Sequence, residues 1–121
     1  MNDKYQTPKY DLEERTFQFA RDVRLFLKNL PRSMSNIEDG KQLIRSSGSI
    51  GANYIEANES LSKKDFMMRI KISRKEAKES IYWLRLLSEI NQSEFTDESM
   101  RLINEATELK KILSSIIEKS K

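Results

Sequence analysis

Residues 63–90, KKDFMMRIKISRKEAKESIYWLRLLSEI, contain neither glycine nor proline, and apolar residues recur in them at intervals of three or four. This spacing places the apolar side chains on one side of an α-helix. Ser62 precedes the stretch and Asp65 follows three residues later, which is the pattern of a relaxed N-terminal capping box. The sequence therefore predicts one continuous helix, about 40 Å long at 1.5 Å per residue.

Three more segments have helical periodicity. The first extends from Asp11, a plausible N-cap, to Leu30, where Pro31 ends it. Its apolar stripe is formed by Phe17, Ala20, Val23, Leu27 and Leu30, widened by Phe19 and Phe26. The last starts after Thr96, with Asp97 and Glu98 in its first turn. Its apolar positions extend to Ile117, before a lysine-rich end.

The second segment extends from about Ser35 to Asn58 and contains a run of small residues around Gly48 and Gly51. Its apolar residues lie on both sides of the glycines, at Ile37, Leu43, Ile44, Ile50, Tyr54 and Ala57. We expect one helix whose small side chains let a neighbouring helix approach closely. A loop break near Gly48 is the alternative, because glycine and serine are weak helix formers.

Four helices joined by short linkers indicate an all-α protein, an antiparallel up-down-up-down four-helix bundle. We expect residues 1–10 to form a flexible N-terminal arm and residues 11–121 to form a single domain. No apolar run is long enough to span a membrane, and the first residues lack the apolar core of a signal peptide, so we expect a cytoplasmic protein without membrane contact.

The 121 residues include no cysteine and no histidine. This excludes disulfides, thiolate nucleophiles, Ser-His-Asp triads, and metal sites that use Cys or His ligands. Four carboxylates on the second and third helices could face one another across the bundle: Glu56, Glu59, Glu76 and Glu79. Without histidine they make a poor metal site and no evident acid–base pair. We therefore predict no enzymatic activity, no catalytic residues, no cofactor and no bound metal.

The 63–90 helix carries eight Lys and Arg residues against four Asp and Glu, in a chain whose net charge is only +3. A helical wheel gathers its cations and one tyrosine on one face: Lys64, Lys71, Arg74, Lys75, Lys78, Tyr82 and Arg85. This face is either a solvated surface or a nucleic-acid-binding surface, in which cations contact phosphates and Tyr82 stacks on a base.

The same helix has two apolar stripes. The core stripe consists of Phe66, Ile70, Ser73, Ala77, Ile81 and Leu84. The second lies about a third of a turn away and consists of Met68, Ile72, Trp83, Leu86 and Ile90. This second stripe is either a widening of the core or a subunit interface of a homo-oligomer, with Trp83 as its anchor.

Three stretches resemble the bacterial four-helix bundle proteins called 23S rRNA intervening sequence proteins, or the S23 family. They are the Tyr10–Phe17 stretch YDLEERTF, the Gln42–Glu59 stretch QLIRSSGSIGANYIEANE and the Phe66–Ser80 stretch FMMRIKISRKEAKES. The resemblance implies an up-down bundle that assembles as a homopentamer. It also implies kinship with the accessory variability determinant of diversity-generating retroelements, a basic pentamer that binds nucleic acid and a reverse transcriptase.

The function expected from these observations is non-enzymatic. We expect an oligomeric bundle that binds RNA, or associates with ribosomal RNA, through the basic face of the 63–90 helix. The alternative is a protein–protein adapter that docks an enzyme such as a reverse transcriptase. The two differ in salt response, because phosphate contacts weaken steeply with ionic strength and a hydrophobic docking surface does not.

Overall fold

The computed structural model describes residues 8–121, and all four expected helices are present. They are α1 (Pro8–Asn29), α2 (Met34–Asn58), α3 (Lys63–Ile90) and α4 (Thr96–Lys119), with a short 3-10 helix, η2 (Ser93–Phe95), before α4. No strand occurs in this part of the chain. The fold is therefore an all-α bundle.

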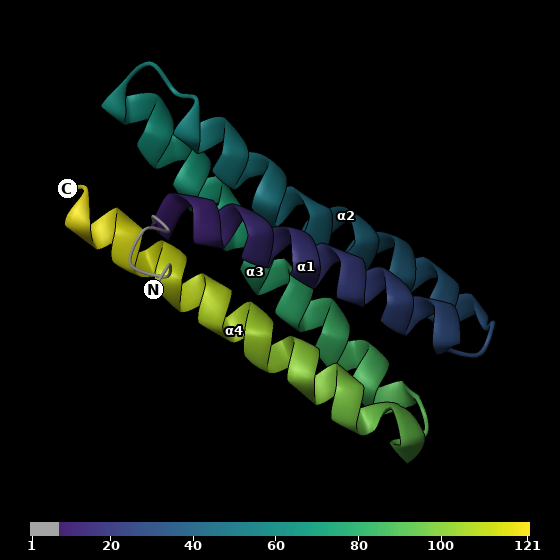
Figure 1. Ribbon diagram of the computed structural model, residues 1–121. Helices are drawn as coiled ribbons and strands as arrows, with labels where there is room; N and C mark the ends of the chain where they lie inside the picture. The colour runs from purple at the N-terminus through teal and green to yellow at the C-terminus, as the bar shows by residue number, and fades with distance from the viewer. Residues whose placement is uncertain (1–7) are drawn as a thin grey trace.

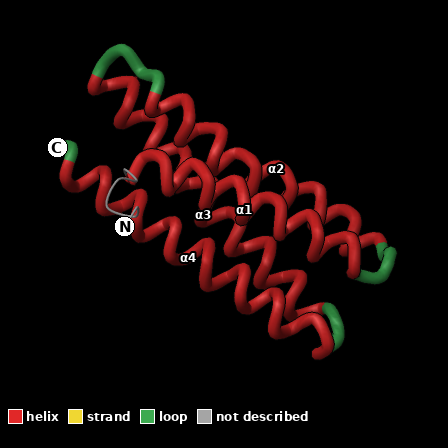
Figure 2. The backbone as a smooth tube through the Cα atoms, in the orientation of Figure 1, coloured by secondary structure: helices red, strands yellow, loops and turns green. Residues whose placement is uncertain are grey.

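Each helix packs against the next one in the sequence, and α1 also packs against α4. The loop between α2 and α3 lies at one end of the bundle, and the loops that follow α1 and α3 lie at the other (Figures 1 and 2). In this arrangement α3 lies between α2 and α4, so that it presents only one side to solvent.

The helix boundaries follow local capping. As predicted, the Ser62 side chain accepts a hydrogen bond from the Asp65 backbone N–H, at 3.0 Å, and α3 ends at Ile90. In α2 the cap is Ser33, whose hydroxyl accepts from the Asn36 N–H at 3.1 Å, so this helix starts slightly before the expected position. Serine suits both positions because its oxygen satisfies a backbone N–H that has no partner within the helix.

The prediction that the first helix starts at Asp11 is wrong, because α1 begins at Pro8. Proline is favoured in the first turn of a helix, since its φ is already helical and its missing N–H would have no partner there. Residues 8–10 of the expected arm therefore belong to the helix, and residues 1–7 lie outside the described part of the chain.

Helix α2 continues through its glycines, so the alternative of a loop break is wrong. A methyl group added at Gly51 would lie 2.8 Å from the Oγ1 atom of Thr16 and 3.2 Å from its Cβ atom. Thr16 belongs to α1 and is itself buried. The small residue at position 51 thus permits the close approach of α1 to α2.

The core runs along the axis of the bundle and receives apolar side chains from all four helices. Of the stripe predicted on α3, Ile70, Ser73, Ala77 and Leu84 are fully buried, and Phe66 and Ile81 pack at its margin. Across the α2–α3 contact, the hydroxyls of Ser46 and Ser80 lie 2.9 Å apart, and the Ser73 hydroxyl donates to the Ile50 carbonyl at 2.7 Å.

The core position predicted for Phe17 is wrong, because this side chain is 63% exposed. The buried aromatic residues of α1 are Phe19 and Phe26. Phe17 and Phe19 are two residues apart and so point about 200° away from each other on a helix, which prevents both from entering one core.

Candidate nucleic-acid interface

The solvent-facing side of α3 is a single line of exposed side chains, which we call the α3 edge. It is exposed because α2 and α4 cover the other sides of this helix. The α3 edge consists of Lys64, Met68, Lys71, Lys75, Lys78, Tyr82, Arg85 and Glu89. It therefore contains every residue of the predicted basic face except Arg74.

Arg74 lies at the margin of the edge, toward α4. Its side chain is half-buried, and its Nη1 atom donates to the Ser114 hydroxyl at 3.4 Å. This contact with a neutral partner leaves the guanidinium charge uncompensated. Arg74 still lines the same surface hollow as the lysines of the edge.

Three shallow hollows follow one another along the α3 edge. A hollow of about 380 Å³ in the middle is lined by Lys71, Arg74, Lys75, Lys78, Glu79 and Tyr82. Toward the start of α3 a hollow of about 560 Å³ is lined by Lys64, Asp65, Met67, Met68, Lys71, Ile72 and Lys75. Toward its end a hollow of about 160 Å³ is lined by Tyr82, Arg85, Leu86 and Glu89. Shared lining residues make the three a continuous track.

The cations of the α3 edge have no acidic partner. In the described residues no ion pair involves Lys64, Lys71, Lys75, Lys78 or Arg85. Elsewhere on the surface Arg15, Arg45 and Arg101 are paired with carboxylates. Lys28, Lys110 and Lys119 also have no ion pair in the described residues, but the α3 edge places five such cations in one line.

Two acidic residues adjoin the edge on the side of α2. Arg45 of α2 lies 3.0 Å from a carboxylate oxygen of Glu79 and 3.6 Å from Oε1 of Glu76. Glu76 is only 7% exposed, and its Oε1 atom accepts no hydrogen bond. Burial, followed by the charge of Glu79, raises the pKa of Glu76, while Arg45 and Lys75 act in the opposite direction.

The four carboxylates considered as a cluster do not come together. Glu76 and Glu79 bind Arg45, whereas Glu56, near the end of α2, and Glu59, just after it, are exposed. Among residues 8–121 no group of three or more acidic side chains is placed to hold a metal ion. Arg45 thus makes the pair on α3 a structural contact between two helices.

Tyr82 is the aromatic residue of the edge, and this residue is 56% exposed. The ring stands edge-on to that of Trp83, with centroids 5.1 Å apart and planes at 79°. Trp83 in turn packs against the core, so the neighbour that supports Tyr82 is itself held in place. Tyr82 is consequently presented to solvent on a fixed support.

The second apolar stripe divides into buried and exposed parts. Trp83 packs against the core, as the interpretation of a widened core expects, and Ile72 and Leu86 are half-buried. Met68 and Ile90 are 49% and 51% exposed. Met68 and Ile72 share a hollow with lysines, so this stripe adjoins the basic face directly.

Sequence reasoning missed a set of exposed apolar residues on α2. Ile37, Ile44 and Ile55 are 37%, 39% and 46% exposed, although the first two were expected to join the apolar run of this helix. Leu43, next to Ile44, takes the core position. Their spacing in the sequence, seven residues from Ile37 to Ile44 and eleven from Ile44 to Ile55, could have indicated this, because it places the three on one line along the helix, separate from the core stripe.

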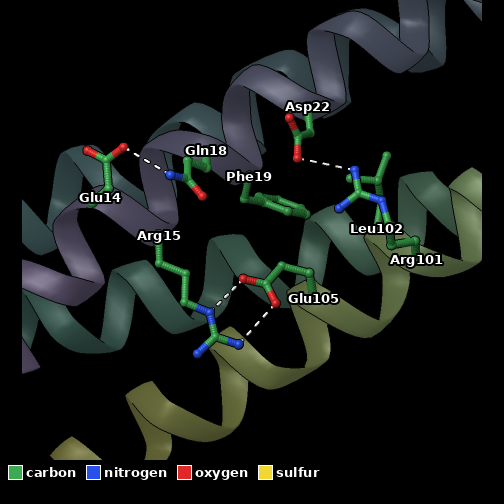
Figure 3. A pocket seen from close by; sticks show the side chains of 8 residues that line it. All are labelled: Glu14, Arg15, Gln18, Phe19, Asp22, Arg101, Leu102 and Glu105. Atoms are coloured by element: carbon green, nitrogen blue, oxygen red, sulfur yellow. Dashed lines mark hydrogen bonds and ion pairs between the residues drawn. The ribbon is translucent and has the colours of Figure 1, made fainter. Parts of the chain in front are cut away.

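Another hollow, of about 390 Å³, lies between α1 and α4 (Figure 3). Its polar side chains bind one another. Arg15 donates two hydrogen bonds to Glu105, at 2.7 and 3.0 Å, and Arg101 donates to Asp22 at 3.1 Å. Hydrogen bonds with Glu98 also raise the pKa of Arg101. These pairs join α1 to α4 and offer little free charge to a ligand.

None of the helices in the described residues is long and apolar enough to cross a membrane. Their exposed surfaces carry the charges and the scattered apolar side chains described above.

Comparison with known proteins gives a consistent picture. A search of curated proteins found no match. Among solved structures, a protein of unknown function from the S23 ribosomal protein family of Bacteroides thetaiotaomicron superposes with a TM-score of 0.80 and 33% identity. The superposition covers 93% of this chain and 99% of the other. The sequence also matches the family described as 23S rRNA-intervening sequence protein over residues 9–115, which are nearly the whole of the chain. The chain therefore belongs to the 23S rRNA-intervening sequence protein family.

Proposed function

We propose that this protein binds RNA in the cytoplasm, without catalysing a reaction, through the α3 edge. The observation that carries the proposal is the row of cations with no acidic partner, together with the exposed ring of Tyr82. Phosphates supply the compensating charge that the protein itself does not.

We further propose that the antiparallel up-down-up-down bundle assembles as a homopentamer through the second apolar stripe of α3. Its support is the half-exposed Met68 and Ile90, which would leave water on contact with another subunit. Assembly would cover Met68 and repeat the cations of the α3 edge around one particle. Several basic edges on one particle would bind RNA more strongly than a single subunit can.

The test of RNA binding is charge reversal at three lysines of the edge, Lys71, Lys75 and Lys78. Each Lys→Glu change lowers the charge by two, so the triple variant carries −3 in place of +3. A matched control reverses the exposed Lys41, Lys111 and Lys119, which gives the same net charge. Fluorescence anisotropy with a labelled hairpin RNA measures the affinity at about 50 and about 200 mM salt.

We expect the parent protein to lose on the order of 10³ in affinity between the two salt concentrations, because each phosphate contact releases counterions and this release is less favourable at higher salt. The edge variant should lose binding at the lower concentration, and the control should keep most of it. Equal losses in both variants would contradict a localised site. No binding of the parent at the lower salt would overturn the proposal.

The second candidate is a protein–protein adapter, favoured by the exposed apolar residues Met68, Ile90 and Leu61, the last of which is 99% exposed. Such a surface holds a partner whose dissociation responds weakly to salt, because apolar burial is not screened. An affinity for a protein partner that survives both the edge variant and high salt would favour this candidate over RNA binding.

A further inference from the structure

On the assumption that the α3 edge binds RNA, we infer that it takes an unpaired strand and that one base of this strand stacks on Tyr82. The flanking phosphates then lie against Lys78 on one side and Arg85 on the other. The ligand is therefore single-stranded or looped RNA rather than RNA in general, and Tyr82 is the residue that selects for it.

Tyr82 lies between two cations of the α3 edge. Lys78 lies one helical turn before it and Arg85 one turn after it, at about 6 and about 4.5 Å along the helix axis. Tyr82 lines both the middle hollow and the last one, so its ring separates the two. A base on the ring would therefore have a cation within reach on each side, as a strand of alternating bases and phosphates requires.

The ring is also free to accept a base. The edge-on contact with Trp83 occupies at most one face of Tyr82, and more than half of the residue is exposed. Because Trp83 packs against the core, little side-chain freedom is lost when a base stacks on its neighbour. The Tyr82 ring is thus both exposed and held in one orientation, as a stacking platform requires.

The packing of α3 argues against a duplex. This helix lies between α2 and α4 and presents only its edge, so it cannot enter a groove. The bases of double-stranded RNA are stacked on one another, and the major groove of the A-form is deep and narrow. A duplex would thus meet the cations but leave the Tyr82 ring without a base.

The acidic residues that line the hollows leave room for an RNA strand along the α3 edge. Glu79 lines the middle hollow, but its carboxylate is paired with Arg45 at 3.0 Å. Glu89 lies beyond Arg85, and Asp65 lies at the start of the track beside Lys64. The section with positive charge therefore extends from Lys64 to Arg85, with Tyr82 near its end.

The experiment compares two RNA probes and two variants. The probes are an unstructured RNA of roughly a dozen nucleotides with alternating C and A, and the same strand annealed to its complement. The variants are Tyr82→Ala and Tyr82→Phe. We expect the parent protein to prefer the single strand. Tyr82→Ala should weaken single-strand binding by about 5- to 100-fold and leave duplex binding unchanged, and Tyr82→Phe should keep the parent affinity because the ring remains.

Trp83 gives an independent readout, because it is the only tryptophan of the chain and its ring contacts that of Tyr82. Its fluorescence should change when the single strand binds and should stay constant with the duplex. Circular dichroism of both variants checks that the helices persist.

Equal affinity of the parent for the two probes, with no effect of Tyr82→Ala, would overturn the inference and leave RNA binding by the lysines intact. Absence of binding to either probe would instead overturn the proposed function. A loss of single-strand binding in Tyr82→Phe as large as in Tyr82→Ala would also contradict stacking.

Discussion

Gly51 and Gly48 lie one turn apart on α2, and they differ in what surrounds them. A methyl group at Gly51 would meet Thr16 of α1 at 2.8 Å, whereas one at Gly48 would meet only the end of the flexible Arg24 side chain, at 3.3 Å. Both positions are helical, so alanine would gain about 1 kcal/mol of helix propensity at each. At Gly51 the clash with α1 decides whether alanine raises or lowers the free energy of unfolding.

We expect Gly51→Ala to lower the free energy of unfolding by about 1–2 kcal/mol, since overpacking exceeds the gain in helix propensity. Gly48→Ala is the matched control and should be neutral or more stable. Urea denaturation measures both. In the background of Thr16→Ala, which removes the nearest atom, the Gly51→Ala change should be less harmful. Equal effects at both glycines would contradict the close approach of the helices.

Glu76 determines a pH dependence of stability. Because burial and Glu79 raise its pKa in the folded chain, the folded state holds this proton to higher pH than the unfolded chain does. The free energy of unfolding therefore falls as the pH rises from the ordinary pKa of a glutamate to the raised one. Arg45 at 3.6 Å reduces this loss without removing it.

We expect Glu76→Gln to be more stable than the parent at pH 7, by about 1 kcal/mol or about 4 °C in Tm. The difference should shrink toward pH 4, below the ordinary pKa of a glutamate, where the carboxyl group is mostly protonated in both states. Thermal denaturation followed by circular dichroism at the two pH values measures this. The control is Glu56→Gln, at an exposed position, which should change little at either pH. A variant that is less stable at pH 7 would show that the contact with Arg45 outweighs the cost of burial.

At the residue scale the sequence identified all five cations of the α3 edge, because one helix wheel fixes their relative directions. The sequence could not show which acidic neighbours of these cations were already paired, since Arg45 meets Glu79 through the packing of two helices. For the same reason it did not show that Trp83 supports the ring of Tyr82 against the core.

The elements themselves were predictable where capping and periodicity agree. α3 has its serine cap, no glycine or proline, and a regular apolar stripe, and both of its ends were found. α1 was placed late at its start because Asp11 resembles a cap, although Pro8 is equally suited to a first turn. Local signals that compete in this way are resolved only by the packing of the complete helix.

At the scale of the whole molecule, the residue pairs that join α1 to α4 had no signal in the sequence. The contact depends on pairs such as Arg15 with Glu105, which are far apart in the chain and are ordinary surface residues by type. Which apolar stripes face solvent was also not predictable, as Ile44 and Phe17 illustrate. Composition constrains how much apolar surface a chain has, whereas the assignment of each stripe needs the positions of all four helices.

The oligomeric state tests the apolar stripe at this scale. We expect Met68→Glu to reduce the particle mass from about five copies of a 14.2 kDa chain toward a single copy, because a charge would have to be buried between subunits. Met100→Glu is the matched control, since Met100 of α4 is 44% exposed against 49% for Met68. Light scattering measures the masses. An unchanged mass for Met68→Glu would show that the interface lies elsewhere, and the exposed isoleucines of α2 would then be the best candidates.

The packing of each helix on its neighbour in the sequence has a consequence for how the chain folds. Interactions between neighbouring helices close only short loops, so the chain has a low contact order and should fold in microseconds to milliseconds. The pairing of α1 with α4, which are distant in the chain, has to wait until α4 has left the ribosome. Until then α1, α2 and α3 would already pack on one another, and α4 would complete the bundle last.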